Sequence, residues 1–244
     1  MTPETWHDAY YGPLQSLYAL LVVPFAYLAH RLAAPAELAR AVVPEAAGFV
    51  ARATIVFAVL TMLDPIATGP LVASEALRGT VAATLVPFFF VYLGDLRVLL
   101  VALAVARPAL PFGSLLARAA AATAIVPIAT GILFAGLRTA LPDVHGQWLW
   151  MIYEAGFLAL CVVAVRRVLP RAGITGPARS FLAALFGYGA AYYALWLAAD
   201  VLIVVAGLDL GWAIRMVPNQ LYYAFWVPFV SWRFFSAAEA KASR

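Results

Sequence analysis

Four carboxylic acids interrupt long apolar stretches of this sequence. They are Asp64, Asp95, Glu154 and Asp200. A carboxylate is costly to place in hydrocarbon, so an acid inside a membrane segment points to a paired cation, a proton relay or a site for a charged solute. These residues are therefore the first candidates for chemistry, either as acids and bases or as an electrostatic trap for a cation.

Counting along the apolar segments places polar groups from four of them in one layer. A helix advances about 1.5 Å per residue, and this count puts the set in the outer half of a bilayer. The layer contains Asp64, Glu154, Asp200, Arg215, Asn219 and Gln220. Tyr192 and Trp196 precede Asp200 at intervals of four and share its helix face, and Tyr223 follows Asn219 at the same interval.

Carboxylates beside aromatic faces suit a cation, because the ring quadrupole adds about 0.5–2 kcal/mol per contact. We therefore predict a ligand-binding pocket, formed by these polar and aromatic residues, that recognises or transports a small cationic solute or a proton. A purely structural interpretation stays open, in which Arg215 neutralises Asp200 or Glu154 and no ligand binds. Two more functions stay open as well: a membrane-embedded enzyme that acts on a lipid or isoprenoid through a buried carboxylate, and a non-catalytic subunit of a membrane complex.

Asp95 and Arg97 form a second, deeper group toward the inner half of the bilayer. Residues two apart on a helix do not face each other, so we expect Arg97 to extend to the inner surface by snorkelling. Arg52, at the inner end of the preceding segment, then becomes the partner of Asp95. We favour a structural ion pair between Arg52 and Asp95 over a gating or proton-relay role.

Seven apolar segments must position these groups. The chain has 244 residues, of which 65% are hydrophobic and 11% charged, with a mean hydropathy of +0.92. A membrane helix needs roughly 20 apolar residues, and the segments that qualify span about 14–31, 48–67, 80–106, 117–137, 147–168, 180–207 and 211–235. We predict a single all-α domain over residues 1–244, a seven-transmembrane-helix bundle with short connections.

The arginines indicate how the bundle is threaded. Most of them lie in alternate connections or in the C-terminal tail, and cytoplasmic loops collect basic residues. This pattern predicts an outer N-terminus and a cytoplasmic C-terminus, and it explains the net charge of +4 without a nucleic-acid partner. The partner that we expect is the lipid bilayer, in a multi-pass protein of the cell membrane. Abundant alanine and arginine suggest a bacterial inner membrane.

Motifs for a bound metal or prosthetic group are missing from the sequence. His7, His30 and His145 are far apart, and Cys161 is the single cysteine, so we predict no metal site. A retinal-binding bundle requires a lysine inside a span, whereas the only lysine, Lys241, lies in the tail. The cofactor, the oligomeric state and the identity of any ligand are not determined at this level.

Overall fold

The computed structural model describes residues 5–12, 19–34 and 38–236, and every regular element in these residues is a helix. Five helices are long and apolar enough to cross a bilayer. They run over Pro44–Gly69, Val81–Ala106, Phe112–Ala140, Gln147–Arg171 and Gly176–Val204. The protein is therefore a multi-pass helical membrane protein, and these helices correspond to the second to sixth predicted segments.

Three of the five helices are uninterrupted, and two contain wider π-helical turns. The uninterrupted ones are α4 (Val81–Ala106), α5 (Phe112–Ala140) and α8 (Gly176–Val204). The first interrupted helix consists of the 3-10 turn η3 (Pro44–Ala46), α3 (Ala47–Ile66) and the π-turn η4 (Ala67–Leu71). The second consists of α6 (Gln147–Val163), the π-turn η5 (Ala164–Val168) and α7 (Leu169–Arg171).

The first and last predicted segments are helical but differ from the other five. Residues 14–18 of the first lie outside the described residues, and the rest forms most of α2 (Ala19–Ala33), whose apolar part is short for a bilayer crossing. The last segment is helical throughout, as α9 (Leu210–Asn219), the π-turn η6 (Gln220–Phe225) and α10 (Trp226–Phe235). The count of seven spans therefore stays a prediction.

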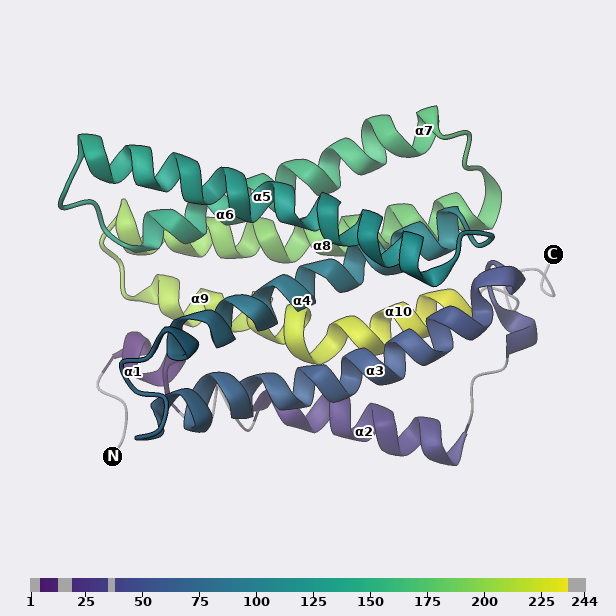
Figure 1. Ribbon diagram of the computed structural model, residues 1–244, viewed down its shortest axis with the longest axis horizontal. Coiled ribbons are helices and arrows are strands. Elements are labelled where there is room, and N and C mark those ends of the chain that lie inside the picture. Colours follow the sequence, from purple (N-terminus) through teal and green to yellow (C-terminus); the bar gives the residue numbers. More distant parts are fainter. Residues whose placement is uncertain (1–4, 13–18, 35–37, 237–244) are drawn as a thin grey trace.

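The long helices pack side by side along one axis (Figure 1). α6 packs against α8, α8 against α9, α4 against α5, and α2 against α3, with α4 and the α9–α10 helix running through the middle. The short helix α1 (Trp6–Tyr10) lies beside the start of α9. We call this the α1 end of the bundle. The opposite end holds α7, the end of α10 and the short 3-10 turn η2 (Leu38–Arg40).

Large side chains fill the bundle toward the end opposite α1. Trp226, Phe181 and Phe234 are almost completely buried. The Phe181 and Phe234 rings meet edge to face with centroids 5.1 Å apart, and Trp226 meets Phe57 in the same way at 6.2 Å. Edge-to-face pairs of this kind add to the stabilisation that burial of the rings provides. This half of the bundle is a packed apolar core.

The last helix is irregular where it passes the centre of the bundle. η6 lies between Pro218 and Pro228, which have no amide hydrogen to donate to the preceding turn. Side chains of other helices use carbonyl groups of this turn: the Tyr188 hydroxyl donates to the Leu221 carbonyl at 2.8 Å, and the Arg97 guanidinium donates to the Tyr222 carbonyl. These hydrogen bonds tie the π-turn to α8 and α4.

α9 crosses α8 closely at Gly211. A Cβ at this position would lie 2.6 Å from the Ala199 carbonyl oxygen and 2.5 Å from Cγ1 of Ile203. We expect Gly211→Ala to lower the free energy of unfolding by about 1–3 kcal/mol, because the added methyl must push the two helices apart. Thermal unfolding in detergent micelles measures the effect. Gly187→Ala is the control, since its Cβ would meet nothing within 4 Å; equal melting temperatures for the two variants would contradict the expectation.

Candidate functional site

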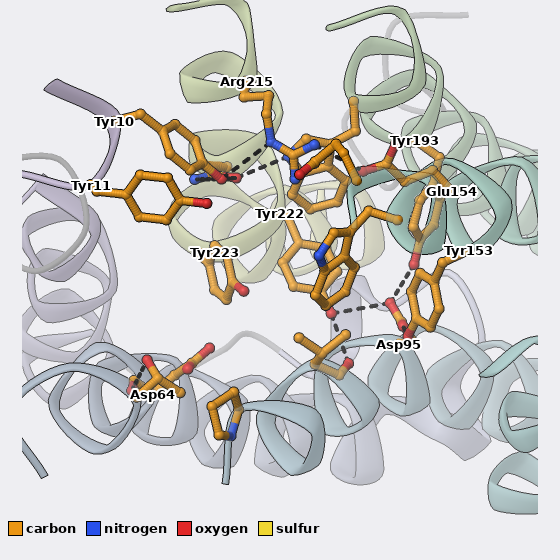
Figure 2. Close-up of a pocket in the computed structure, with 17 residues that line it drawn as sticks. Tyr10, Tyr11, Asp64, Asp95, Tyr153, Glu154, Tyr193, Arg215, Tyr222 and Tyr223 are labelled. Carbon is orange, nitrogen blue, oxygen red and sulfur yellow. Dashed lines mark hydrogen bonds and ion pairs between the residues drawn. The ribbon is translucent and has the colours of Figure 1, made fainter. Parts of the chain in front are cut away.

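A polar cavity of about 250 Å³ lies toward the α1 end, between α3, α4, α6, α8 and the last helix. Figure 2 shows the side chains that line it. They are Tyr10, Tyr11, Asp64, Thr68, Pro87, Val91, Asp95, Gln147, Trp150, Tyr153, Glu154, Tyr193, Trp196, Arg215, Asn219, Tyr222 and Tyr223. Three carboxyl groups thus face the cavity with one guanidinium group, and eight of the lining residues are tyrosine or tryptophan.

Arg215 on α9 holds two acids from two other helices. Its Nη1 donates to Oδ1 of Asp200 on α8 and lies 3.4 Å from Oε1 of Glu154 on α6. The other oxygen of Asp200 accepts a hydrogen bond from Nε2 of Gln147 at 2.9 Å. Asp200 is completely buried and does not line the cavity, so its charge serves to hold Arg215.

Glu154 is the less satisfied member of this cluster. Only 3% of its surface is exposed, and its Oε2 is buried without a hydrogen-bond partner among the described residues. Buried polar atoms of folded proteins are almost always paired, and an exception calls for an explanation. Glu154 also lines the cavity, so its carboxyl group is one of the acids beside any molecule that binds there.

The N-terminal helix covers the α1 end of the cavity. The Asp209 carboxylate accepts hydrogen bonds from the backbone amides of Trp6 at 2.6 Å and His7 at 3.2 Å, which fixes α1 to the start of α9. The Tyr10 hydroxyl then meets the Asn219 amide nitrogen at 3.2 Å, and Asn219 accepts from the Trp196 indole at 2.9 Å. This network places aromatic rings from α1 and α8 at the wall of the cavity.

Asp95 lies on the far wall of the cavity, where three tyrosines converge on it (Figure 2). The hydroxyls of Tyr153 and Tyr193 donate to its two carboxyl oxygens, and the Tyr222 hydroxyl lies 3.1 Å from Oδ1. Asp95 is 2% exposed. The predicted ion pair with Arg52 is wrong, because Arg52 is exposed and three hydroxyl groups of other helices surround the carboxyl group.

Arg97 does not reach the membrane surface as we expected. It is buried, donates to the Tyr222 carbonyl and to the Thr61 hydroxyl at 3.3 Å, and stacks its guanidinium 4.6 Å from the ring centroids of Tyr222 and Trp226. The aromatic faces, the Tyr222 carbonyl and the Thr61 hydroxyl replace water around the charge, so snorkelling is unnecessary. Arg97 therefore lies between the polar cavity and the apolar core.

Asp64 on α3 faces the cavity and has no salt bridge with any described residue. A void of about 20 Å³ lies beside it and is also lined by Arg97 and Tyr223. The Thr68 hydroxyl donates to the Asp64 backbone carbonyl at 2.9 Å, which secures the turn into η4. Asp64 is thus a second carboxyl group without an arginine partner, in addition to Asp95.

The structure brings six of the nine predicted ligand-binding residues to one cavity. They are Asp64, Glu154, Trp196, Arg215, Asn219 and Tyr223. Asp200, Tyr192 and Gln220 do not line it. Asp200 is engaged by Arg215, and Tyr192 packs among other aromatic rings. Asp95, which was predicted at a deeper level than these residues, also lines the cavity.

Most of the tyrosines that line the cavity were not among the predicted residues. Tyr153 and Tyr193 stand next to the candidates Glu154 and Tyr192, and Tyr222 precedes Tyr223. Tyr193 and Trp196 are three residues apart. Residues three apart on a helix lie on the same face, as residues four apart do. That pattern was available in the sequence, but the choice between adjacent tyrosines depends on helix rotation.

The Arg215 cluster makes a testable contribution to stability. We expect Arg215→Gln to lower the free energy of unfolding by about 3–5 kcal/mol, because it leaves the fully buried Asp200 without a cation. Adding Asp200→Asn should recover a large part of the loss, since the second change removes the uncompensated charge. Chemical unfolding of the single and double variants measures the coupling; losses that simply add would contradict the pairing.

The chain was also compared with known proteins. No protein-family model, no curated protein and no solved structure matches it.

Proposed function

We propose that this membrane protein binds a small organic cation in the polar cavity, as a carrier or as a receptor. The observation that carries the proposal is the excess of acid: Asp64, Asp95 and Glu154 face the cavity with Arg215 alone, and Arg215 is already held by Asp200. Charge that the protein leaves uncompensated in a buried site favours a ligand that compensates it. Glu154 is one of these acids, and its Oε2 is buried without a partner among the described residues.

The lining favours an organic cation over a metal ion. The described residues contain no group of three or more potential metal ligands. Tyrosine and tryptophan rings line the cavity instead, and such rings bind ammonium groups through their faces. A volume of about 250 Å³ lies below the usual range for drug-sized ligands, so the ligand that fits is small.

The arginine distribution supports an orientation for the cavity. Arginines crowd the end opposite α1, on η2, η5, α7 and the end of α10, and the positive-inside rule assigns that end to the cytoplasm. We propose that the α1 end faces outward, with the N-terminus outside, in the cell membrane of a bacterium. The exposed ring of Tyr11 then marks the outer rim of the cavity.

Binding of tetramethylammonium to the purified protein tests the proposal. We expect Glu154→Gln and Asp64→Asn each to weaken binding about tenfold or more, because each removes a carboxylate that attracts the cation at short range. Isothermal titration calorimetry in detergent micelles gives the affinities.

Asp143→Asn is the matched control for these two variants. Asp143 is exposed in the connection between α5 and α6, where water and salt screen its charge, so its replacement should leave the affinity unchanged. A wild-type protein that does not bind tetramethylammonium, or variants that bind it equally well, would refute the proposed site.

A further inference from the structure

The hydroxyl group of Tyr222 lies close to two acceptors, one of them Asp95. The Tyr222 hydroxyl oxygen is 3.0 Å from the Val91 carbonyl oxygen and 3.1 Å from Oδ1 of Asp95. A tyrosine hydroxyl carries one hydrogen, so it can donate to one of these two acceptors and not to both. When it donates to Val91, the hydrogen in the contact with Asp95 must come from Asp95 itself.

A protonated Asp95 satisfies every contact in this cluster. Oδ1 then donates to Tyr222, Tyr222 donates to Val91, and the hydroxyls of Tyr153 and Tyr193 donate to the two carboxyl oxygens. With Asp95 ionised, one pair of oxygens about 3 Å apart would have no hydrogen between them. We infer that Asp95 is an exchangeable proton site, occupied in this structure, and that it releases its proton when a cation enters the polar cavity.

In the ionised form the carboxylate gains a third donor, and the contact between Tyr222 and Val91 loses its hydrogen. Rotation of the Tyr222 hydroxyl turns its hydrogen from Val91 to Asp95, and the carboxylate then accepts from three hydroxyl groups. Hydrogen bonds to an ionised acceptor are stronger than those between neutral groups. Asp95, Tyr153 and Tyr193 all line the cavity, so the departing proton passes directly to water there.

Among the described residues, the titratable groups around Asp95 include one cation and no ion pair with it. Those that face it are Tyr153 and Cys161 from α6, Tyr192 and Tyr193 from α8, Tyr222 and Tyr223 from η6, and Arg97 from its own helix. Asp64 of α3 lines the same cavity, α5 carries only Arg118 and Arg138, near its two ends, and η4 carries no titratable group. Arg97 is the one nearby cation in this set, and its hydrogen bonds go to Thr61 and to the Tyr222 carbonyl.

The coupling follows from charge balance and rests on the proposed function. A monovalent cation that enters the cavity replaces the charge of the proton that leaves Asp95, so the net charge of the site is unchanged. Ionisation of Asp95 raises the affinity for the cation by some factor. By thermodynamic linkage, a bound cation shifts the ionisation equilibrium of Asp95 toward the carboxylate by the same factor. Cation uptake and proton release are then one exchange reaction.

Infrared spectroscopy of the purified protein tests the proton site without any ligand. We expect Asp95→Asn to remove one component of the protonated-carboxyl C=O band, and Asp143→Asn, at an exposed acid, to leave the band intact. Tyr222→Phe should shift the same component to higher wavenumber, because it removes the acceptor of the Asp95 proton. A band unchanged in Asp95→Asn overturns the inference; if that variant does not fold, an unshifted band in Tyr222→Phe overturns it.

Proton release on addition of tetramethylammonium tests the coupling. In weakly buffered solution, a pH indicator should report about one proton fewer released per bound cation in Asp95→Asn than in the wild type. The wild-type affinity should rise about tenfold between about pH 5 and about pH 9, and by less in the variant. Equal release by the two proteins overturns the coupling. Absence of wild-type binding refutes the proposed function instead, and the infrared result still decides whether Asp95 holds a proton.

Discussion

The described part of the bundle buries four carboxyl groups with two arginines, and this imbalance organises the half that contains the cavity. Arg215 forms a salt bridge with Asp200 and a longer one, at 3.4 Å, with Glu154. Arg97 contacts aromatic faces and a carbonyl oxygen, so it leaves Asp64 and Asp95 without a salt bridge. Because isolated charges are costly in a medium of low polarity, the remaining acids need protons, hydroxyl donors or a bound cation. Asp64 and Asp95 both line the polar cavity, so these ways of compensating a buried acid all concern the same site.

Tyrosine is the residue that makes this arrangement possible. Its ring fills space in an apolar bundle, while its hydroxyl supplies one hydrogen that can be redirected between acceptors. Tyr222 illustrates both properties, since its ring stacks under Arg97 and its hydroxyl reaches Asp95 and Val91. Gly94 leaves the room for this approach: a Cβ there would lie 1.9 Å from the Tyr222 hydroxyl oxygen. The π-turn that carries Tyr222 also exposes the carbonyl that Arg97 uses.

The two halves of the bundle differ in a way that bears on the kind of activity. The polar cavity lies toward the α1 end, whereas Trp226, Phe181 and Phe234 form a packed core toward the opposite end. A ligand in the cavity is therefore accessible from one side of the protein in this conformation. Transport would require the core around the last helix to open, whereas a receptor would need only local changes near α1. The irregular η6 turn, between the two halves, is the natural place for either motion.

The apolar runs and their lengths were enough to predict a helical membrane bundle, because hydrocarbon admits few other structures. Depth along each helix was also predictable, and it placed Asp64, Glu154, Arg215 and Asn219 together. The rotation of each helix about its axis was not predictable. Tyr192 was therefore predicted to line the cavity, whereas its neighbour Tyr193 does so. The partners of Asp95 and Arg97 come from helices distant in sequence and include a backbone carbonyl in a π-turn. Only tertiary packing decides such contacts, because they depend on how neighbouring helices are turned and where their backbones deviate from the α-helix.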